Sequence, residues 1–294
     1  MAAALEVAAD RIEHASVLDK PADVLAGLVR RLIPHGPVED LASGSPLGHP
    51  AHPILVAVPI GSWVSANLLD LTGGDARTTR RLVGLGILTA VPAAAAGASD
   101  WATTSGAERR IGLVHAALNW TALGLYSASW VARGRGRRVK GALLALAGTG
   151  VVSASGWLGG HLSYALGVGV DTTAFQSLPR DWTDVAAESD VAADKLVLAD
   201  AGGIPVLLVR AGDRITAMAD RCTHRGGPLN EGEIRDGCVV CPWHQSEFAL
   251  ADGSLVHGPA TRPQPTAEVR VVGGRVQLRR ADEPRSLRAD SVGP

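Results

Sequence analysis

Two cysteines and two histidines stand in two short loops near the end of the sequence. The first loop reads CTHRGGPL at residues 222–229, and the second reads CPWHQSEF at residues 241–248. Each loop supplies one cysteine and one histidine, and thiolate and imidazole groups are ligands for zinc and for iron. We therefore expect four side chains to hold a metal centre: Cys222, His224, Cys241 and His244.

Three interpretations of these four residues remain open. Zinc accepts two cysteines and two histidines, but zinc fingers pair cysteine with cysteine and histidine with histidine. A two-iron cluster can take one cysteine and one histidine from each loop, with both cysteines on one iron and both histidines on the other. In the third interpretation the residues are only structural. The mixed loops favour the two-iron centre.

Residues 183–280 resemble Rieske 2Fe–2S domains. The resemblance rests on both loops and on GPATRPQP at residues 258–265, which is similar to the proline loop that covers the cluster in that family. It implies a 2Fe–2S cluster bound by the four side chains.

Several positions depart from the quinol-oxidising members of the Rieske family. Those members carry a disulfide where this sequence has Gly227 and Trp243, and a tyrosine where it has Phe248, although Ser246 is kept. Gln245 replaces the usual glycine. Fewer hydrogen bonds to the cluster sulfurs predict a midpoint potential in the lower half of the roughly −150 to +300 mV Rieske range.

Short strands frame the two loops. Apolar runs at residues 195–200, 204–212 and 214–220 are separated by Gly-Gly and Gly-Asp turns, and residues 267–280 form a hairpin over Gly273-Gly274. This pattern predicts an all-β domain. Cys238 falls in one of the strands, where we expect it to pack as a small hydrophobic residue.

Four apolar stretches occupy the middle third of the sequence. They span residues 54–71, 82–99, 111–132 and 141–161. About 20 helical residues cross a bilayer, so the third and fourth are long enough, while the first two are marginal and Pro59 and Asp70 interrupt the first. The alternative is a soluble bundle, which would show polar stripes at helical spacing. We predict a four-helix transmembrane bundle followed by the all-β Rieske domain.

This middle region also resembles an uncharacterised four-helix membrane domain that is common in bacteria. The resemblance runs from about Asp40 to Asp171 and rests on LGHPAHPILVAVPIGSW, on Asp70, and on GWLGGHLSYALGVGVD at residues 156–171. It implies a membrane location and no particular biochemical role.

Four histidines from three of these helices are predicted to lie in one leaflet: His49, His52, His115 and His161. Asn119 lies one turn below His115. Ionisable residues at membrane depth are often functional, so we expect a haem b or quinone site there. The alternative is that the histidines only bind water and helix ends at the interface. No Cys-x-x-Cys-His stretch occurs, which excludes covalent haem.

The predicted organisation is an amphipathic helical segment at 1–40, a membrane domain at 41–171, a linker at 172–182, the Rieske domain at 183–281 and a disordered tail at 282–294. Within the first segment, apolar residues recur at helical spacing. They are Val24, Leu25, Leu28 and Leu32, and we expect them to lie on the membrane or on the bundle.

Two arguments about membrane orientation oppose each other. Basic residues concentrate in the breaks at 72–81 and 133–140, which the positive-inside rule places in the cytoplasm. Rieske clusters are assembled in the cytoplasm, however, and no twin-arginine signal or disulfide accompanies this domain. We favour a cell-membrane, multi-pass protein with a cytoplasmic Rieske domain.

These observations predict an electron-transfer component rather than a self-contained enzyme, with no catalytic residues of its own. Its partner would be a ferredoxin, reductase or oxygenase. Two alternative functions for the chain are a membrane-tethered ferredoxin, with the helices as an anchor only, and a redox sensor. A nicotinamide-binding fingerprint does not occur, and a net charge of −1 gives no reason to expect nucleic acid.

Overall fold

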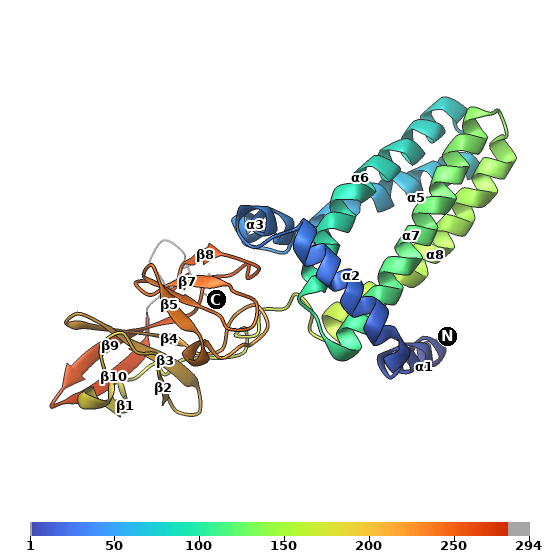
Figure 1. The fold of residues 1–294 in the computed structure, drawn as a ribbon. Helices are drawn as coiled ribbons and strands as arrows, with labels where there is room; N and C mark the ends of the chain where they lie inside the picture. The colour runs from blue at the N-terminus through green and yellow to red at the C-terminus, as the bar shows by residue number, and fades with distance from the viewer. Residues whose placement is uncertain (1, 282–294) are drawn as a thin grey trace, which may run out of the picture. The chain divides into compact units, whose positions relative to one another are not determined.

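The structure of this chain is a computed structural model that describes residues 2–281. The chain divides into two compact units, Met1–Val170 and Asp171–Pro294, which are described separately below. The tail predicted at 282–294 lies outside the described residues. The predicted fold class is confirmed, because a helical region precedes an all-β unit (Figure 1).

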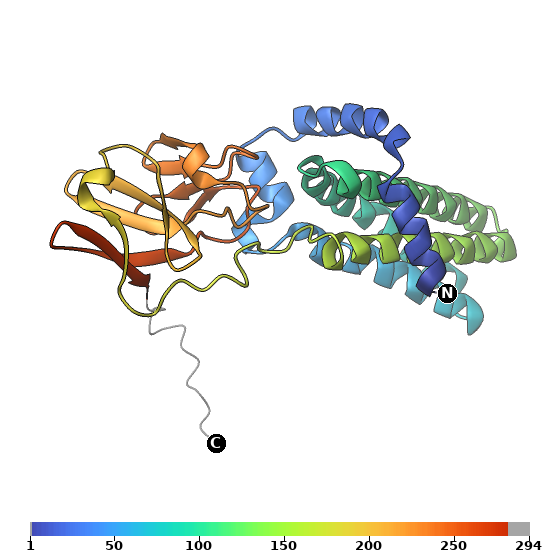
Figure 2. The ribbon, with the colours of Figure 1, turned by 90° about the horizontal axis from the view of Figure 1, so that it is seen from below.

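Eight α-helices lie in the described part of the first unit, residues 2–170. They are α1 (Ala2–Glu13), α2 (Asp19–Leu32), α3 (Pro37–Ser43), α4 (Ala51–Leu55), α5 (Ala57–Leu71), α6 (Ala76–Ala102), α7 (Gly106–Gly134) and α8 (Arg138–Tyr164). The last four run side by side in both views (Figure 1, Figure 2). Helix α5 packs on α6 and α8, and α7 packs on the same two, so the bundle closes on itself.

Aromatic rings that pack closely against glycines on neighbouring helices hold this bundle together. Trp63 on α5 stacks on Tyr126 on α7 with ring centroids 4.0 Å apart. A methyl group at Gly86 would lie 2.2 Å from the Trp63 ring, and one at Gly148 would lie 2.9 Å from Tyr126. The glycines that the sequence places in the apolar stretches therefore admit large rings between closely packed helices.

Three segments of the described chain are long and apolar enough to cross a membrane: Ala51–Leu71, Ala76–Ala102 and Arg138–Tyr164. The first two predicted stretches, which are marginal on their own, lie within longer segments that meet this length, whereas the third predicted stretch, on α7, is not among the three. Helix α7 is as long, but His115 and Asn119 interrupt its apolar stretch. Pro59 has no amide hydrogen and crowds the preceding turn, and the helix breaks at Val56 between α4 and α5.

Helix α2 turns small residues inward and large apolar residues outward. It packs on α6 and α7 and buries Ala22 and Ala26. Its outer face exposes Val24, Leu28 and Leu32. Such an exposed apolar face is typical of a helix that lies in a membrane interface.

The described residues of the second unit, 171–281, contain ten strands. They are β1 (Thr183–Ala187), β2 (Val197–Asp200), β3 (Pro205–Ala211), β4 (Arg214–Ala219), β5 (Glu233–Arg235), β6 (Cys238–Val240), β7 (Glu247–Ala249), β8 (Leu255–His257), β9 (Thr266–Val272) and β10 (Arg275–Arg280). One sheet has the order β1-β10-β9-β4-β3-β2, and the other has the order β5-β6-β7-β8. Cys238 is buried in β6, as predicted. Leu207 and Met218 from the first sheet share one core with Val239 and Phe248 from the second.

Candidate metal centre

The first ligand loop leaves the end of β4 and closes on itself within a few residues. The amide of Cys222 donates to the carbonyl of Gly227 at 2.9 Å, and the amide of Gly226 donates back to the carbonyl of Cys222 at 2.8 Å. Gly226 has a φ of +75°, a left-handed value that a residue without Cβ adopts without strain. These turns position Cys222 and His224 on one short loop.

The second ligand loop leaves β6 and has the same kind of closure. The amide of Cys241 donates to the carbonyl of Ser246 at 2.9 Å, and the amide of Gln245 donates to the carbonyl of Cys241 at 3.0 Å. Gln245 has a φ of +62°. The backbone therefore still has the left-handed conformation that suits the usual glycine, although this chain carries a glutamine there.

The two loops bring the four predicted ligands together as two pairs. Cys222 and Cys241 lie in the same buried core cluster, at 1% and 2% exposed, and their side chains interact with each other. The rings of His224 and His244 lie 5.1 Å apart, centroid to centroid, and are nearly perpendicular. Within residues 2–281, no three His, Cys, Asp or Glu side chains converge on the position of a single ion. A cysteine pair and a histidine pair suit two irons better than one tetrahedral zinc.

The protonation of His224 and Cys241 also suits a metal. Burial holds the pKa of His224 well below its usual value, so the ring is neutral, and its buried Nδ1 has no hydrogen-bond partner in the described chain. The Cys222 thiol donates to Cys241, which together with the amides of Trp243 and His244 lowers the pKa of Cys241 to about 7. That same donated hydrogen bond, with burial, raises the pKa of Cys222. A neutral imidazole and a stabilised thiolate are the forms that bind metal.

A third loop, at residues 258–265, joins β8 to β9 and packs against both ligand loops. The amide of Ala260 donates to Oγ of Ser246 at 3.0 Å. Gln264 is only 2% exposed, and its Nε2 donates to the carbonyls of Ala219 at 2.6 Å and Arg221 at 2.7 Å. Its Oε1 accepts from the amide of Thr223 at 3.2 Å. This one side chain therefore ties the proline loop to the backbone on both sides of Cys222.

Sequence reasoning missed Gln264, although one signal was present. Gln264 stands between two prolines in a loop interpreted as a cover, where proline supplies no amide hydrogen for neighbouring carbonyls. Buried backbone groups in such a loop require side-chain partners. A glutamine at that place could have been recognised as the partner.

We expect Gln264→Ala to shorten the lifetime of the cluster. The substitution leaves two carbonyls and one amide beside Cys222 without partners, and each buried unsatisfied group costs about 1–3 kcal/mol. The measurement is the rate at which the visible absorption of the cluster bleaches in air. Gln277→Ala on the β9–β10 hairpin is the matched control. Equal bleaching rates for both variants would contradict the role of Gln264.

Gly227 and Trp243 fill the place where the quinol-oxidising Rieske proteins carry a disulfide. A methyl group at Gly227 would lie 2.9 Å from Sγ of Cys241 and 3.1 Å from the Trp243 ring. The indole of Trp243, which is 56% exposed, therefore lies directly over the glycine. Phe248 lies fully buried in the core that also contains both ligand cysteines, and it offers no hydroxyl.

The histidines of the helical unit do not form one group of four. His52 on α4 and His115 on α7 lie together, with ring centroids 6.4 Å apart. His161 instead pairs through Nε2 with Glu13 at 2.7 Å and stacks on Trp157. His49 is exposed.

The His52 and His115 rings are both held by helix carbonyls. Nδ1 of His52 lies 2.8 Å from the carbonyl of Ala93 on α6, and Nδ1 of His115 lies 2.8 Å from that of Ser155 on α8. Because a carbonyl only accepts, both rings carry their hydrogen on Nδ1 and present Nε2 as an acceptor. Nε2 of His115 accepts from Nδ2 of Asn119 at 3.0 Å.

Comparison with known proteins agrees with this geometry. Residues 181–272 match the family model "Rieske [2Fe-2S] domain", and residues 48–172 match "Predicted membrane protein (DUF2231)". The chain is 34% identical over 98 residues to the anthranilate 1,2-dioxygenase ferredoxin subunit of Burkholderia cepacia, which covers 33% of this chain and 91% of that protein. It is 32% identical over 98 residues to ferredoxin CarAc of Metapseudomonas resinovorans, covering 33% of this chain and 92% of that one.

A solved structure is also similar. The ferredoxin of carbazole 1,9a-dioxygenase from Nocardioides aromaticivorans IC177 aligns with a TM-score of 0.33 at 24% identity. The alignment covers 34% of this chain and 98% of that ferredoxin.

Proposed function

The chain belongs to the Rieske [2Fe–2S] family through residues 181–272, and from that membership we propose that it is a membrane-bound one-electron carrier. The observation that carries the proposal is the pairing of two cysteines and two histidines on two closed loops. A cluster bound there takes up and releases one electron at a time. The chain's own part is to supply the two imidazoles and the two cysteine sulfurs, to bury the sulfurs, and to keep the loops closed through Gln264.

We propose that the helical unit crosses the cell membrane several times and that the Rieske domain lies in the cytoplasm. The match of residues 48–172 to a predicted membrane protein family and the three long apolar segments support the membrane location. The glycine and tryptophan at the disulfide position support a reducing compartment. The basic residues of the loops at 72–81 and 133–140 oppose this orientation.

The redox partner is proposed to be a separate protein, either an oxygenase or a reductase. The relatives whose length the chain covers are named as a ferredoxin subunit of a dioxygenase and as a ferredoxin. Oxygenase chemistry on the same polypeptide would require a second iron held by two histidines and a carboxylate. Residues 2–281 present no such group.

A second candidate function is electron exchange with a haem b or a quinone in the helical unit. The observation that favours it is the pair His52 and His115, each anchored through Nδ1 to a helix carbonyl. Histidines that bind metals usually donate their other ring hydrogen in this way. His49 and His161, which lie apart from this pair, have no role in this version of the hypothesis.

An optical and EPR spectrum of the detergent-purified, dithionite-reduced full chain tests both candidates. A Rieske signal without a Soret band excludes haem b and leaves the helical unit as an anchor or a quinone site, of which the anchor is the better interpretation. A Rieske signal with a Soret band that disappears in His52→Ala/His115→Ala supports the second candidate. Stoichiometric zinc with no Rieske signal would overturn the proposal.

The potential of the cluster is expected in the lower half of the roughly −150 to +300 mV range. Phe248→Tyr should raise it, because a hydroxyl near the cluster sulfurs would stabilise the reduced form. For a one-electron couple, about 59 mV corresponds to a tenfold change in equilibrium constant, or about 1.4 kcal/mol, which is the scale of one such hydrogen bond. The measurement is an EPR-monitored redox titration. Phe175→Tyr, at an exposed phenylalanine, is the control and should leave the potential unchanged.

A further inference from the structure

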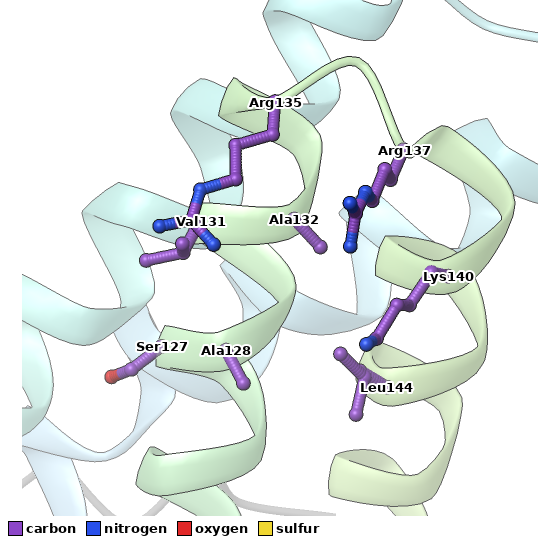
Figure 3. Close-up of a pocket in the computed structure, with 8 residues that line it drawn as sticks. All are labelled: Ser127, Ala128, Val131, Ala132, Arg135, Arg137, Lys140 and Leu144. Atoms are coloured by element: carbon purple, nitrogen blue, oxygen red, sulfur yellow. The ribbon is translucent and has the colours of Figure 1, made fainter.

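A hollow of 360 Å³ opens between α7 and α8, close to the turn that joins them. Its floor is apolar and includes Ala128, Val131 and Leu144. Three basic residues stand around its rim: Arg135, Arg137 and Lys140. Figure 3 shows Arg137 and Lys140 extending from the start of α8 toward α7, with Arg135 running down beside Val131.

The three basic side chains have no polar partner within residues 2–281. None of them makes an ion pair or a side-chain hydrogen bond to another residue in the part of the chain that the structure describes. Two neighbouring arginines do have partners. Arg133 pairs with Asp70, and Arg138 donates to the carbonyl of Gly74 at 2.6 Å. The rim therefore has positive charge available for an anion.

The position of the hollow identifies the kind of anion. Helix α8 is long and apolar enough to cross a membrane, and the hollow lies at its first turns. The rim would then lie at the depth of lipid headgroups, and the floor at the depth where acyl chains begin. Large apolar residues beside the hollow, such as Val139 and Leu143, are exposed as lipid-facing residues are.

We propose that this hollow binds an anionic phospholipid. The phosphate lies among Arg135, Arg137 and Lys140, and the start of an acyl chain lies along Val131 and Leu144. Basic pockets between membrane helices recognise lipid headgroups in this way, and the apolar floor would gain nothing from a free phosphate ion. The proposal goes beyond electron transfer, does not rest on it, and holds for either orientation in the membrane.

The test compares two double variants of the full chain in detergent. Arg137→Gln/Lys140→Gln removes rim charges, while Arg77→Gln/Arg81→Gln removes two exposed charges from the first turns of α6, at the same end of the bundle but outside the hollow. The thermal unfolding midpoint is recorded while dioleoyl phosphatidylglycerol or dioleoyl phosphatidylcholine is titrated in.

Phosphatidylglycerol is expected to raise the midpoint of the unchanged chain and of the α6 variant, and phosphatidylcholine is not. The half-saturating concentration should be about 30-fold higher for the rim variant, since two basic groups near the headgroup are lost. If the half-saturating concentration rises equally in the α6 variant, binding depends on diffuse surface charge, and the proposal is overturned. An equal midpoint rise with inorganic phosphate would also overturn it, by indicating a simple anion site.

Discussion

Replacing His224 by alanine is expected to abolish the Rieske cluster. The ring of His224 faces that of His244 at 5.1 Å, and its buried Nδ1 has no partner among the described residues. Alanine removes one of the two proposed nitrogen ligands to one iron. The iron content of the purified protein should fall from about two per chain to near zero, together with its visible absorption and EPR signal.

A cysteine that is not a ligand provides the control for this loss. Cys238 is buried in β6, three residues before Cys241, and packs as a small apolar residue. Cys238→Ser should keep both irons, although a buried hydroxyl there lowers the stability of the domain. Loss of the cluster in Cys238→Ser but not in His224→Ala would reverse the assignment of ligands. Finding one zinc ion per chain in the unchanged protein would instead support the tetrahedral zinc site.

The part of this site that follows from local sequence was predictable. A tight loop restricts the positions of a cysteine and a histidine separated by one or two residues, so CTHRGGPL and CPWHQSEF each determine one half of the centre. Glycine turns between short apolar runs likewise indicate strands, because alternation and turn chemistry are local properties. The two halves meet because both loops lead away from strands that share one core.

The other features of the site and of the helical unit depend on contacts between residues that are far apart in the chain. Gln264 reaches backbone groups about forty residues earlier, and no local pattern predicts where a loop side chain is buried. The histidines show the same limit. Their predicted depth in a membrane follows from helix length, but the rotation of each helix decides that His115 meets His52 while His161 meets Glu13.

Asp70→Ala is expected to lower the stability of the helical unit by about 3–5 kcal/mol. As part of an apolar stretch Asp70 looked like an interruption, but its carboxylate makes a two-pronged pair with the guanidinium of Arg133 on α7. One prong measures 2.9 Å between Nη1 and Oδ1, and the Arg133 and Asp70 side chains are only 3% and 9% exposed. Removing the carboxylate leaves the charge of Arg133 buried and unpaired, which destabilises the folded state strongly.

The unfolding free energy of the full chain in mixed micelles, followed by helical circular dichroism, measures this effect. Asp75→Ala is the matched control: that carboxylate is five residues away, caps the start of α6 through the Thr78 amide at 2.7 Å, and is exposed. Loss of such a cap costs about 1 kcal/mol. A similar loss for both variants would show that the Asp70–Arg133 pair is not special.

A double variant separates the attraction within the pair from the penalty of breaking it. Replacing both partners, as Asp70→Leu/Arg133→Met, leaves no charge behind, so most of the stability lost in Asp70→Ala should return. The buried pair would then serve mainly to fix which ends of α5 and α7 meet, rather than to add stability. The cluster spectrum should stay unchanged in every one of these variants, because all four proposed ligands belong to the second unit. A change in that spectrum would mean that the end of the bundle and the metal centre are coupled.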